Sequence, residues 1–342
     1  MSVKKNPEIS HTKKKMRPSR VVLSVIALLL VAALLFTFLT PFPASWIIRA
    51  IFKNGIAVTP DNYDAILETV TVTKDLVYPS EYKSNFADIY VPKDKEGPFP
   101  IVLWVHGGAF VGGDKNDIEV FATALASEGI AVACINYQLA PEAKYPTPII
   151  QTQEAYTWLE SISDDYSIDM SRLVLAGDSA GAHIVSQFAA IQSNPAYAAE
   201  MSMEQVVPSG DLKAVMLYCG PFDVSDMTLG SNVLINFMMN RAAWAYFGSK
   251  DWADRFAYQA TIPNHITKDF PPTFITDGNS MSFEKHGRNL ADVISRNGVP
   301  VETYFIPIEV SEAVHEYQFI MDTPESREAF LKTVAFIEKY TK

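Results

Sequence analysis

The sequence predicts an α/β fold with a mostly parallel, eight-stranded sheet, helices on both faces and one large insertion. Strand-like apolar runs alternate with helical segments along most of its 342 residues. Most of these runs are apolar without interruption, and about fifty residues separate the sixth from the seventh. Alternating strands and helices give a doubly wound sheet. Uninterrupted apolar runs are typical of parallel strands that are covered on both faces.

Eight segments are expected as strands. Residues 70–73 and 86–91 alternate between apolar and polar side chains, as half-buried antiparallel strands do. Continuous runs follow at residues 101–105, 130–135, 173–176, 214–219 and 272–276, and residues 301–306 close the series. Helices are expected between and after them, at residues 118–128, 148–162, 180–192, 283–297 and 325–340.

The long connection at about residues 221–270 is expected to form a cap, inserted between strands 6 and 7. Connections of this length inside a compact domain are usually functional. Its content argues against a solvated loop, because it holds the bulky apolar residues Phe237, Met238, Met239, Trp244, Tyr246 and Phe247.

Charge and hydropathy divide the N-terminal part of the chain. Residues 1–20 carry seven Lys and Arg against one Glu, a charge of +6 in a chain of net charge −11, so the rest carries −17. An acidic body argues against a nucleic-acid partner. Residues 21–40 carry no charge, and twenty helical residues span about 30 Å, the thickness of a bilayer core.

Residues 21–40 are therefore interpreted as an N-terminal transmembrane anchor. The competing interpretation is a cleaved signal peptide, whose apolar region is usually about 7–15 residues long and ends in small residues. Here the run is longer and leads into Pro41, Phe42, Pro43 and Trp46. Basic flanks remain in the cytoplasm. Hence residues 1–20 are expected to be a cytoplasmic tail of a single-pass protein of the cell membrane, and the domain at residues 70–342 is expected to be extracellular.

Residues 41–69 connect the anchor to the domain and have helical potential. Their apolar face would lie at the membrane surface or over the catalytic domain as cap helices; it consists of Trp46, Ile47, Ile48, Ile51 and Phe52. Elsewhere, Cys134 and Cys219 each lie in a strand-like run and are expected to be buried free thiols.

The central motif is Gly177-Asp178-Ser179-Ala180-Gly181, between a buried strand and a helix. A G-x-S-x-G sequence in that context is the signature of a nucleophile elbow, a tight turn that exposes the serine at the carboxyl end of a sheet. The glycines are needed because side chains there would collide with neighbouring backbone. Ser179 is the expected nucleophile.

A serine hydroxyl needs a base to take its proton, and His315 is the candidate. It lies in the loop after the last strand, and a serine that precedes its histidine agrees with the chain order of such sites. The other histidines lie in the basic tail, on the helix below the serine, in the cap, in a later helix and in a glycine-rich loop: His11, His183, His265, His286 and His106.

That glycine-rich loop, residues 106–113, follows the third strand and is expected to form an oxyanion hole. Glycine allows the main chain to approach a substrate oxygen closely. The N–H groups of Gly108, Ala109 and Ala180 are the expected donors, while His106 and Gly107 support the loop.

Together, His106-Gly107-Gly108-Ala109 and the elbow motif resemble the α/β-hydrolase fold in its hormone-sensitive-lipase and carboxylesterase branch, from about residue 80 onward. The resemblance implies a serine hydrolase. Relatives usually have a fourth glycine where this chain has Ala109. They also carry an aspartate a few residues past the seventh strand, where this chain has Ser280 or Met281.

Three carboxylates could replace that aspartate. Glu284, in the first turn of the next helix, is the first choice because its side chain points back toward the helix N-terminus. Asp277 stands at the strand end, and Asp223 follows the sixth strand. A Ser–His dyad without an acid is a fourth arrangement.

The expected activity is that of a membrane-anchored serine carboxylesterase, working through an acyl-enzyme without metal or organic cofactor. An apolar cap favours an uncharged small-molecule ester with a short or medium acyl chain, and acetyl or feruloyl groups on polysaccharide are also open. A catalytically inactive binding module of the same fold, or a peptidase or formamidase, are the alternatives. Nothing in the sequence indicates an oligomeric state.

Overall fold

The structure, a computed structural model, describes residues 18–53 and 55–342. Most of the basic tail expected at residues 1–20, with His11, lies outside the described residues. An eight-stranded sheet forms the centre of the molecule, in the order β1-β2-β4-β3-β5-β6-β7-β8. The strands are β1 (Val70–Val77), β2 (Phe86–Pro92), β3 (Phe99–Val105), β4 (Ala131–Ile135), β5 (Ile168–Asp178), β6 (Leu212–Tyr218), β7 (Thr273–Asp277) and β8 (Val301–Phe305).

The pairing confirms the predicted mostly parallel sheet. Strands β3 to β8 pair parallel with one another, whereas β2 pairs antiparallel with both β1 and β4. The two strands with an alternating sequence pattern thus pair antiparallel with each other at one edge of the sheet.

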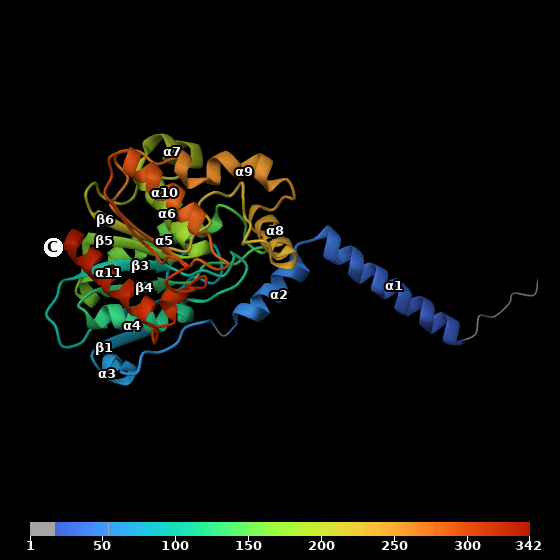
Figure 1. The fold of residues 1–342 in the computed structure, drawn as a ribbon, viewed down its shortest axis with the longest axis horizontal. Helices are drawn as coiled ribbons and strands as arrows, with labels where there is room; N and C mark the ends of the chain where they lie inside the picture. Colours follow the sequence, from blue (N-terminus) through green and yellow to red (C-terminus); the bar gives the residue numbers. More distant parts are fainter. Residues whose placement is uncertain (1–17, 54) are drawn as a thin grey trace, which may run out of the picture.

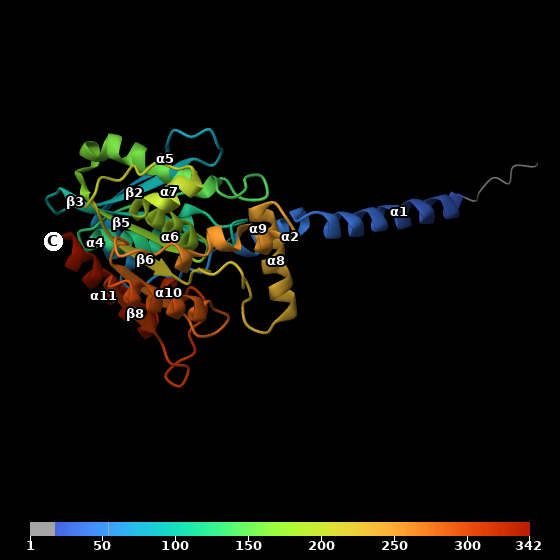
Figure 2. The ribbon, with the colours of Figure 1, turned by 90° about the horizontal axis from the view of Figure 1, so that it is seen from above.

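Helices cover both faces of the sheet (Figures 1 and 2). The α-helices are α1 (Pro18–Leu39), α2 (Phe42–Phe52), α3 (Tyr63–Glu68), α4 (Glu119–Ser127), α5 (Thr147–Ile162), α6 (Ala180–Ser193), α7 (Pro195–Met201), α8 (Val233–Phe247), α9 (Trp252–Ala260), α10 (Glu284–Arg296) and α11 (Pro324–Thr341). Four 3₁₀ turns, η1 (Lys115–Ile118), η2 (Ser163–Tyr166), η3 (Ile262–Asn264) and η4 (Tyr317–Phe319), complete the described elements.

The alternation of side chains along β3 shows how the two cores form. Ile101, Leu103 and Val105 pack in the cluster that contains residues of α5, α6 and α10. Val102 and Trp104 point the other way, into the cluster with α4 and α11. Successive strand residues face opposite sides, so an uninterrupted apolar strand supplies both cores.

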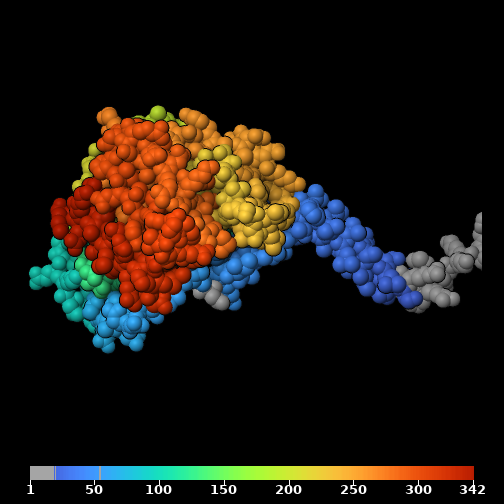
Figure 3. Space-filling view, in the orientation of Figure 1, coloured from blue at the N-terminus to red at the C-terminus, as the bar shows by residue number. Residues whose placement is uncertain are grey.

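Two further expectations from the sequence agree with the structure. Cys134 and Cys219 lie in the second core cluster as buried, free cysteines. Among the described residues, one helix, Val21–Leu39, is long and apolar enough to cross a membrane, with a mean hydropathy of 3.0. The helix projects from the body with its side chains exposed (Figure 3).

Candidate active site

Ser179 lies in a tight turn between β5 and α6, as the elbow motif predicts. Its backbone adopts φ 49° and ψ −117°, a region that residues other than glycine rarely occupy. A methyl group at Gly177 would collide with the backbone of Gly181, and one at Gly181 would collide with the carbonyl oxygen of Val105. The two glycines therefore allow the strained turn, and such strain commonly accompanies function.

His315 is brought to Ser179 from the loop after β8. Its Nε2 lies 3.0 Å from Ser179 Oγ, within hydrogen-bond distance. The loop is held by the His315 N–H, which donates to the carbonyl of Ser280 at 3.2 Å. The ring also lies edge-on to Phe283, with the ring centres 5.7 Å apart. These contacts hold the imidazole ring between the serine and the end of β7.

Asp277, the last residue of β7, stands at the other end of the imidazole. Its Oδ1 lies 3.5 Å from Nδ1 of His315. The carboxylate is buried and accepts hydrogen bonds from the N–H groups of Gly278 at 2.7 Å and Phe283 at 2.8 Å. These donors orient the side chain toward the histidine.

The structure does not bring Glu284 or Asp223 to His315. The Glu284 carboxylate accepts a hydrogen bond from Nε of Arg288, one turn further along α10, at 2.8 Å. Asp223 instead accepts hydrogen bonds from Ser225 and Thr261. Of the three candidate acids, Asp277 is therefore the one that lies beside the imidazole. Asp277 reaches the imidazole from the last position of β7, without any further residues of the chain.

The surroundings of His315 also set its basicity. Burial by itself lowers the pKa of the imidazole, but the neighbouring Asp277 carboxylate, and then the charge of Glu316, raise it. The net effect is a pKa above the usual 6.5 of histidine. A stronger base in contact with the serine hydroxyl is what general-base catalysis requires.

The glycine-rich loop after β3 runs beside the serine in an unusual conformation. Gly108, Ala109 and Phe110 all have positive φ, at 106°, 53° and 63°. The loop closes on itself, because the Val111 and Gly112 N–H groups donate to the carbonyl of Gly108. Within the described part of the chain, the N–H groups of Gly108, Ala109 and Ala180 have no protein acceptor. These three N–H groups are therefore free to bind a substrate oxygen.

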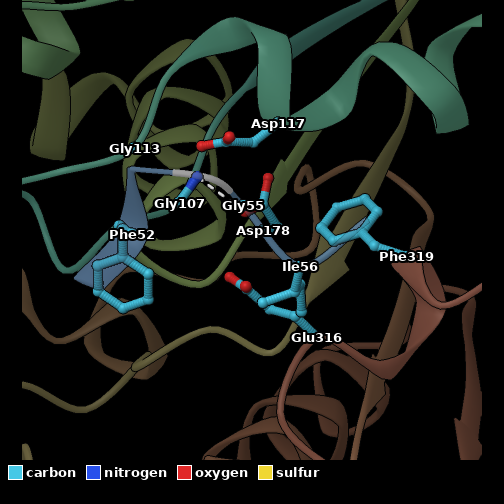
Figure 4. A pocket seen from close by; sticks show the side chains of 10 residues that line it. Phe52, Gly55, Ile56, Gly107, Gly113, Asp117, Asp178, Glu316 and Phe319 are labelled. Atoms are coloured by element: carbon cyan, nitrogen blue, oxygen red, sulfur yellow. Dashed lines mark hydrogen bonds between the residues drawn. The ribbon is translucent and has the colours of Figure 1, made fainter. Parts of the chain in front are cut away.

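Asp178, the residue before the serine, ties this loop to the elbow (Figure 4). One of its carboxylate oxygens accepts from the N–H of Gly107, and the other from Trp104 Nε1, each at 2.8 Å. Burial and the nearby Glu316 raise the pKa of the Asp178 carboxyl well above its usual range. Sequence reasoning missed this role, although an acid at the end of an apolar strand is an available signal.

The small pocket drawn in Figure 4 is lined on one side by glycines of that loop. Asp178 and Glu316 line it with Asp117, whose pKa burial raises to about 6. Phe52 at the end of α2 and Phe319 complete the apolar part of its wall. The pocket therefore separates the loop from the connector that follows α2.

His106 contacts the glycine-rich loop through its imidazole ring. Its Nδ1 lies 2.7 Å from the carbonyl oxygen of Gly107, and its ring stacks on Tyr137 with the centres 4.5 Å apart. Burial lowers the pKa of His106 to about 4, so the ring is neutral at pH 7.

The remaining described histidines lie apart from the serine hydroxyl. His183 is buried, its Nε2 lies 2.8 Å from the carbonyl oxygen of Ala260, and burial lowers its pKa to about 4. His265 stacks on Tyr197, and Nδ1 of His286 accepts from the N–H of Asp223. All three take part in packing or structural hydrogen bonds.

One group of side chains has the composition of a cation site. Ligand atoms of Cys219, Asp277 and His315 lie within 4.8 Å of one another. Burial raises the pKa of the Cys219 thiol well above its ordinary value. Metal binding needs the thiolate, so this environment disfavours a metal. Asp277 and His315 are better explained by their contact with each other.

The fold and this arrangement define an α/β hydrolase of the hormone-sensitive-lipase and carboxylesterase type. The chain belongs to the BD-FAE family, which matches residues 87–283, more than half of its length.

Known proteins agree with that assignment. The chain is 24% identical to an acetyl esterase of Salmonella schwarzengrund over 258 residues, 71% of this chain and 73% of that protein. It is 22% identical to an alpha/beta hydrolase of Acanthamoeba polyphaga mimivirus over 271 residues, 73% of this chain and 70% of that protein. Among solved structures, esterase B from Lactobacillus rhamnosis has a TM-score of 0.72 at 20% identity, covering 91% of this chain and 95% of that one.

Proposed function

We propose that this protein is a membrane-anchored serine carboxylesterase in which Ser179 is the nucleophile, His315 the general base and Asp277 the orienting acid. The observation that carries the proposal is the 3.0 Å contact between Ser179 Oγ and His315 Nε2 at a strained elbow. The chain has both the serine and the histidine, and the two are in contact, which argues against an inactive binding module.

The reaction follows from the geometry. Ser179 Oγ attacks the ester carbonyl carbon while Nε2 of His315 takes the hydroxyl proton. The N–H groups of Gly108, Ala109 and Ala180 bind the oxygen that becomes negative in the tetrahedral intermediate. The imidazolium then gives its proton to the leaving alcohol, and the acyl-enzyme remains. A water molecule, deprotonated by His315, hydrolyses the acyl-enzyme and regenerates the serine.

The substrate proposed is an uncharged carboxylic ester with a short or medium acyl chain. Support comes from the acetyl esterase among the relatives and from the apolar insertion between β6 and β7. Tyr246 on α8 of this insertion stacks on Phe110 of the glycine-rich loop, with ring centres 3.9 Å apart. We therefore assign α8 and α9 to a cap over the site.

The anchor proposed is the exposed apolar helix at Val21–Leu39, with the catalytic domain outside the cell and residues 1–20 in the cytoplasm. A signal peptide has the same apolar character. N-terminal sequencing of the mature protein distinguishes the two, because a start near residue 45 would indicate cleavage and secretion.

A substrate panel tests the activity. The full chain is assayed with p-nitrophenyl esters of increasing acyl length and with a matched anilide, beside Ser179→Ala. Esterase activity that is highest with short or medium chains and lost in Ser179→Ala is the expected result. Hydrolysis that persists in Ser179→Ala would contradict the assignment, and preference for the anilide would favour the peptidase or formamidase alternative.

A further inference from the structure

Two helices join the projecting α1 to the catalytic body. In both ribbon views α2 and α8 lie side by side between the sheet and α1 (Figures 1 and 2). Each presents large apolar side chains to solvent, which we call the α2–α8 face. It consists of Trp46, Ile47 and Ile51 of α2 and Val233, Leu234 and Phe237 of α8. Val233 is 84% exposed and Ile51 is 69% exposed. Exposed apolar side chains gathered on adjoining elements mark an interaction site.

Both helices meet α1 at its last turn. The ring of Trp46 lies 5.9 Å from that of Phe36. From α8 and the loop after it, Arg241 and Lys250 donate to the carbonyl oxygen of Phe38, at 3.4 Å and 3.2 Å. Cations are favoured at a helix C-terminus, where carbonyl groups lack helical partners. These bonds hold the body against the end of α1.

The residue types at this junction are those of a membrane interface. The Arg241 guanidinium lies 5.0 Å from the ring centre of Trp244, and the Lys250 ammonium lies 4.7 Å from it. Trp is enriched at both membrane interfaces, and long Arg and Lys side chains near the ends of a spanning helix reach to the headgroup region. Because α2 begins three residues after the end of α1, the chain between them spans at most about 11 Å. An anchored α1 therefore keeps α2 at the surface of the bilayer.

The inner sides of the same helices contact the glycine-rich loop of the active site. Nε of Arg49 on α2 donates to the carbonyl of Val111 at 2.6 Å. A methyl group at Gly112 would touch the Arg49 backbone, 3.4 Å from its Cα. On α8, Tyr246 stacks on Phe110. One layer of helix, about 10 Å thick, thus separates the proposed oxyanion donors from the α2–α8 face.

We propose that the α2–α8 face rests on a phospholipid bilayer and that the enzyme takes from it an ester whose alcohol part is dissolved in the lipid. This inference rests on the proposed function for the reaction and on α1 as the anchor. The apolar side chains of the face would be buried at the boundary between headgroups and acyl chains. Arg241 and Lys250 would then lie at the level of the lipid phosphates. Continuity with α1 selects the bilayer over other apolar partners.

The position of the face is tested by fluorescence quenching in the full chain. The protein is reconstituted in phosphatidylcholine vesicles with and without brominated acyl chains, as wild type, Trp46→Phe and Trp158→Phe. Bromine quenches only indoles that enter the lipid. Trp158 lies on α5, where its ring packs against Tyr78, so its removal should leave the quenched component intact. Trp46→Phe should remove a large part of that component.

The substrate is tested with two esters of the same acid. One is p-nitrophenyl acetate in water, and the other is the acetate of a long-chain alcohol in the vesicles. The double variant Ile47→Gln/Ile51→Gln should hydrolyse the second ester about tenfold more slowly than wild type. Its rate on the first ester should be unchanged. The matched control is Val77→Gln/Leu331→Gln, which alters two exposed apolar residues of β1 and α11 and should affect neither rate.

The outcomes separate this inference from the proposed function. Quenching that is the same in Trp46→Phe and wild type would overturn the inference, and a dimer of the full chain would then assign the face to a second copy. Equal losses on both esters in the double variant would also overturn it. Quenching of Trp46 without Ser179-dependent hydrolysis of any ester would support the assignment of the α2–α8 face to the bilayer. It would contradict the proposed function.

Discussion

Oδ1 of Asp277 lies 3.5 Å from Nδ1 of His315, and the Asp277 carboxylate is held there by two backbone N–H groups. The imidazole is thus placed between a buried carboxylate and the Ser179 hydroxyl. Glu284 and Asp223 have other partners. Variants of Asp277 and Glu284 should therefore differ in activity.

Asp277→Asn should lower kcat by about 10⁴-fold, the loss expected when an orienting carboxylate is replaced by its amide. Glu284→Gln removes only the ion pair with Arg288 on α10 and should leave kcat near that of wild type. Steady-state kinetics on p-nitrophenyl acetate makes the comparison. A large loss in Glu284→Gln with an active Asp277→Asn would restore the first choice drawn from the sequence.

The pH dependence of kcat/KM should show the basicity of His315. Only the neutral imidazole accepts the serine proton, so activity falls as the pH drops through the pKa of His315. Burial lowers that pKa, but Asp277 and then Glu316 raise it above 6.5, so the acidic limb should lie above pH 6.5. In Asp277→Asn the burial remains without the carboxylate, and the limb of the residual activity should move to lower pH. A limb at the same pH in both proteins would argue against the Asp277 contact.

Gly108→Ala should lower kcat by roughly 10²–10³-fold, the loss typical of a missing oxyanion donor. Gly108 has φ 106°, and a side chain there would collide with the backbone of Gly112, so the loop must shift its N–H groups. The control is Gly210→Ala, which has a similar positive φ of 89° but no neighbour within 4 Å of the added methyl group. Similar kcat values in the two variants would mean that the loop does not bind the oxyanion.

Arg49→Gln should destabilise the fold by about 1–3 kcal/mol, because it leaves buried acceptors without their donor. Arg49 donates to the carbonyls of Val111 and Ala140 and pairs with Glu142. Urea-induced unfolding measures the free energy. Arg296→Gln is the control, since Arg296 is exposed at the end of α10. A loss no larger than that of the control would show that α2 is held by its apolar contacts alone.

The sequence predicted the strands and helices of the body well because their signals are local. The four residues before Gly177 are all apolar, and the elbow glycines have no alternative at such close backbone approach. His315 followed from chain order, since only one histidine stands in the loop after β8.

The acid could not be chosen from the sequence, because that choice depends on tertiary geometry. The segment after β7 turns back at once, with Gly278 and Phe283 both donating to Asp277, so the strand end itself reaches His315. Spacing alone suggested a residue further along. The packing of α2 beside α8 is likewise a contact between segments nearly two hundred residues apart, for which neither helix carries a local signal.

The central claim is that His315 activates the hydroxyl of Ser179 for attack. Its most direct measurement is the rate of labelling by a fluorophosphonate probe, with the adduct mapped by peptide mass spectrometry in wild type, Ser179→Ala and His315→Ala. One adduct per chain is expected, on Ser179, with labelling lost in Ser179→Ala and strongly slowed in His315→Ala. Wild-type labelling no greater than that of Ser179→Ala, or an adduct on another residue, would contradict it.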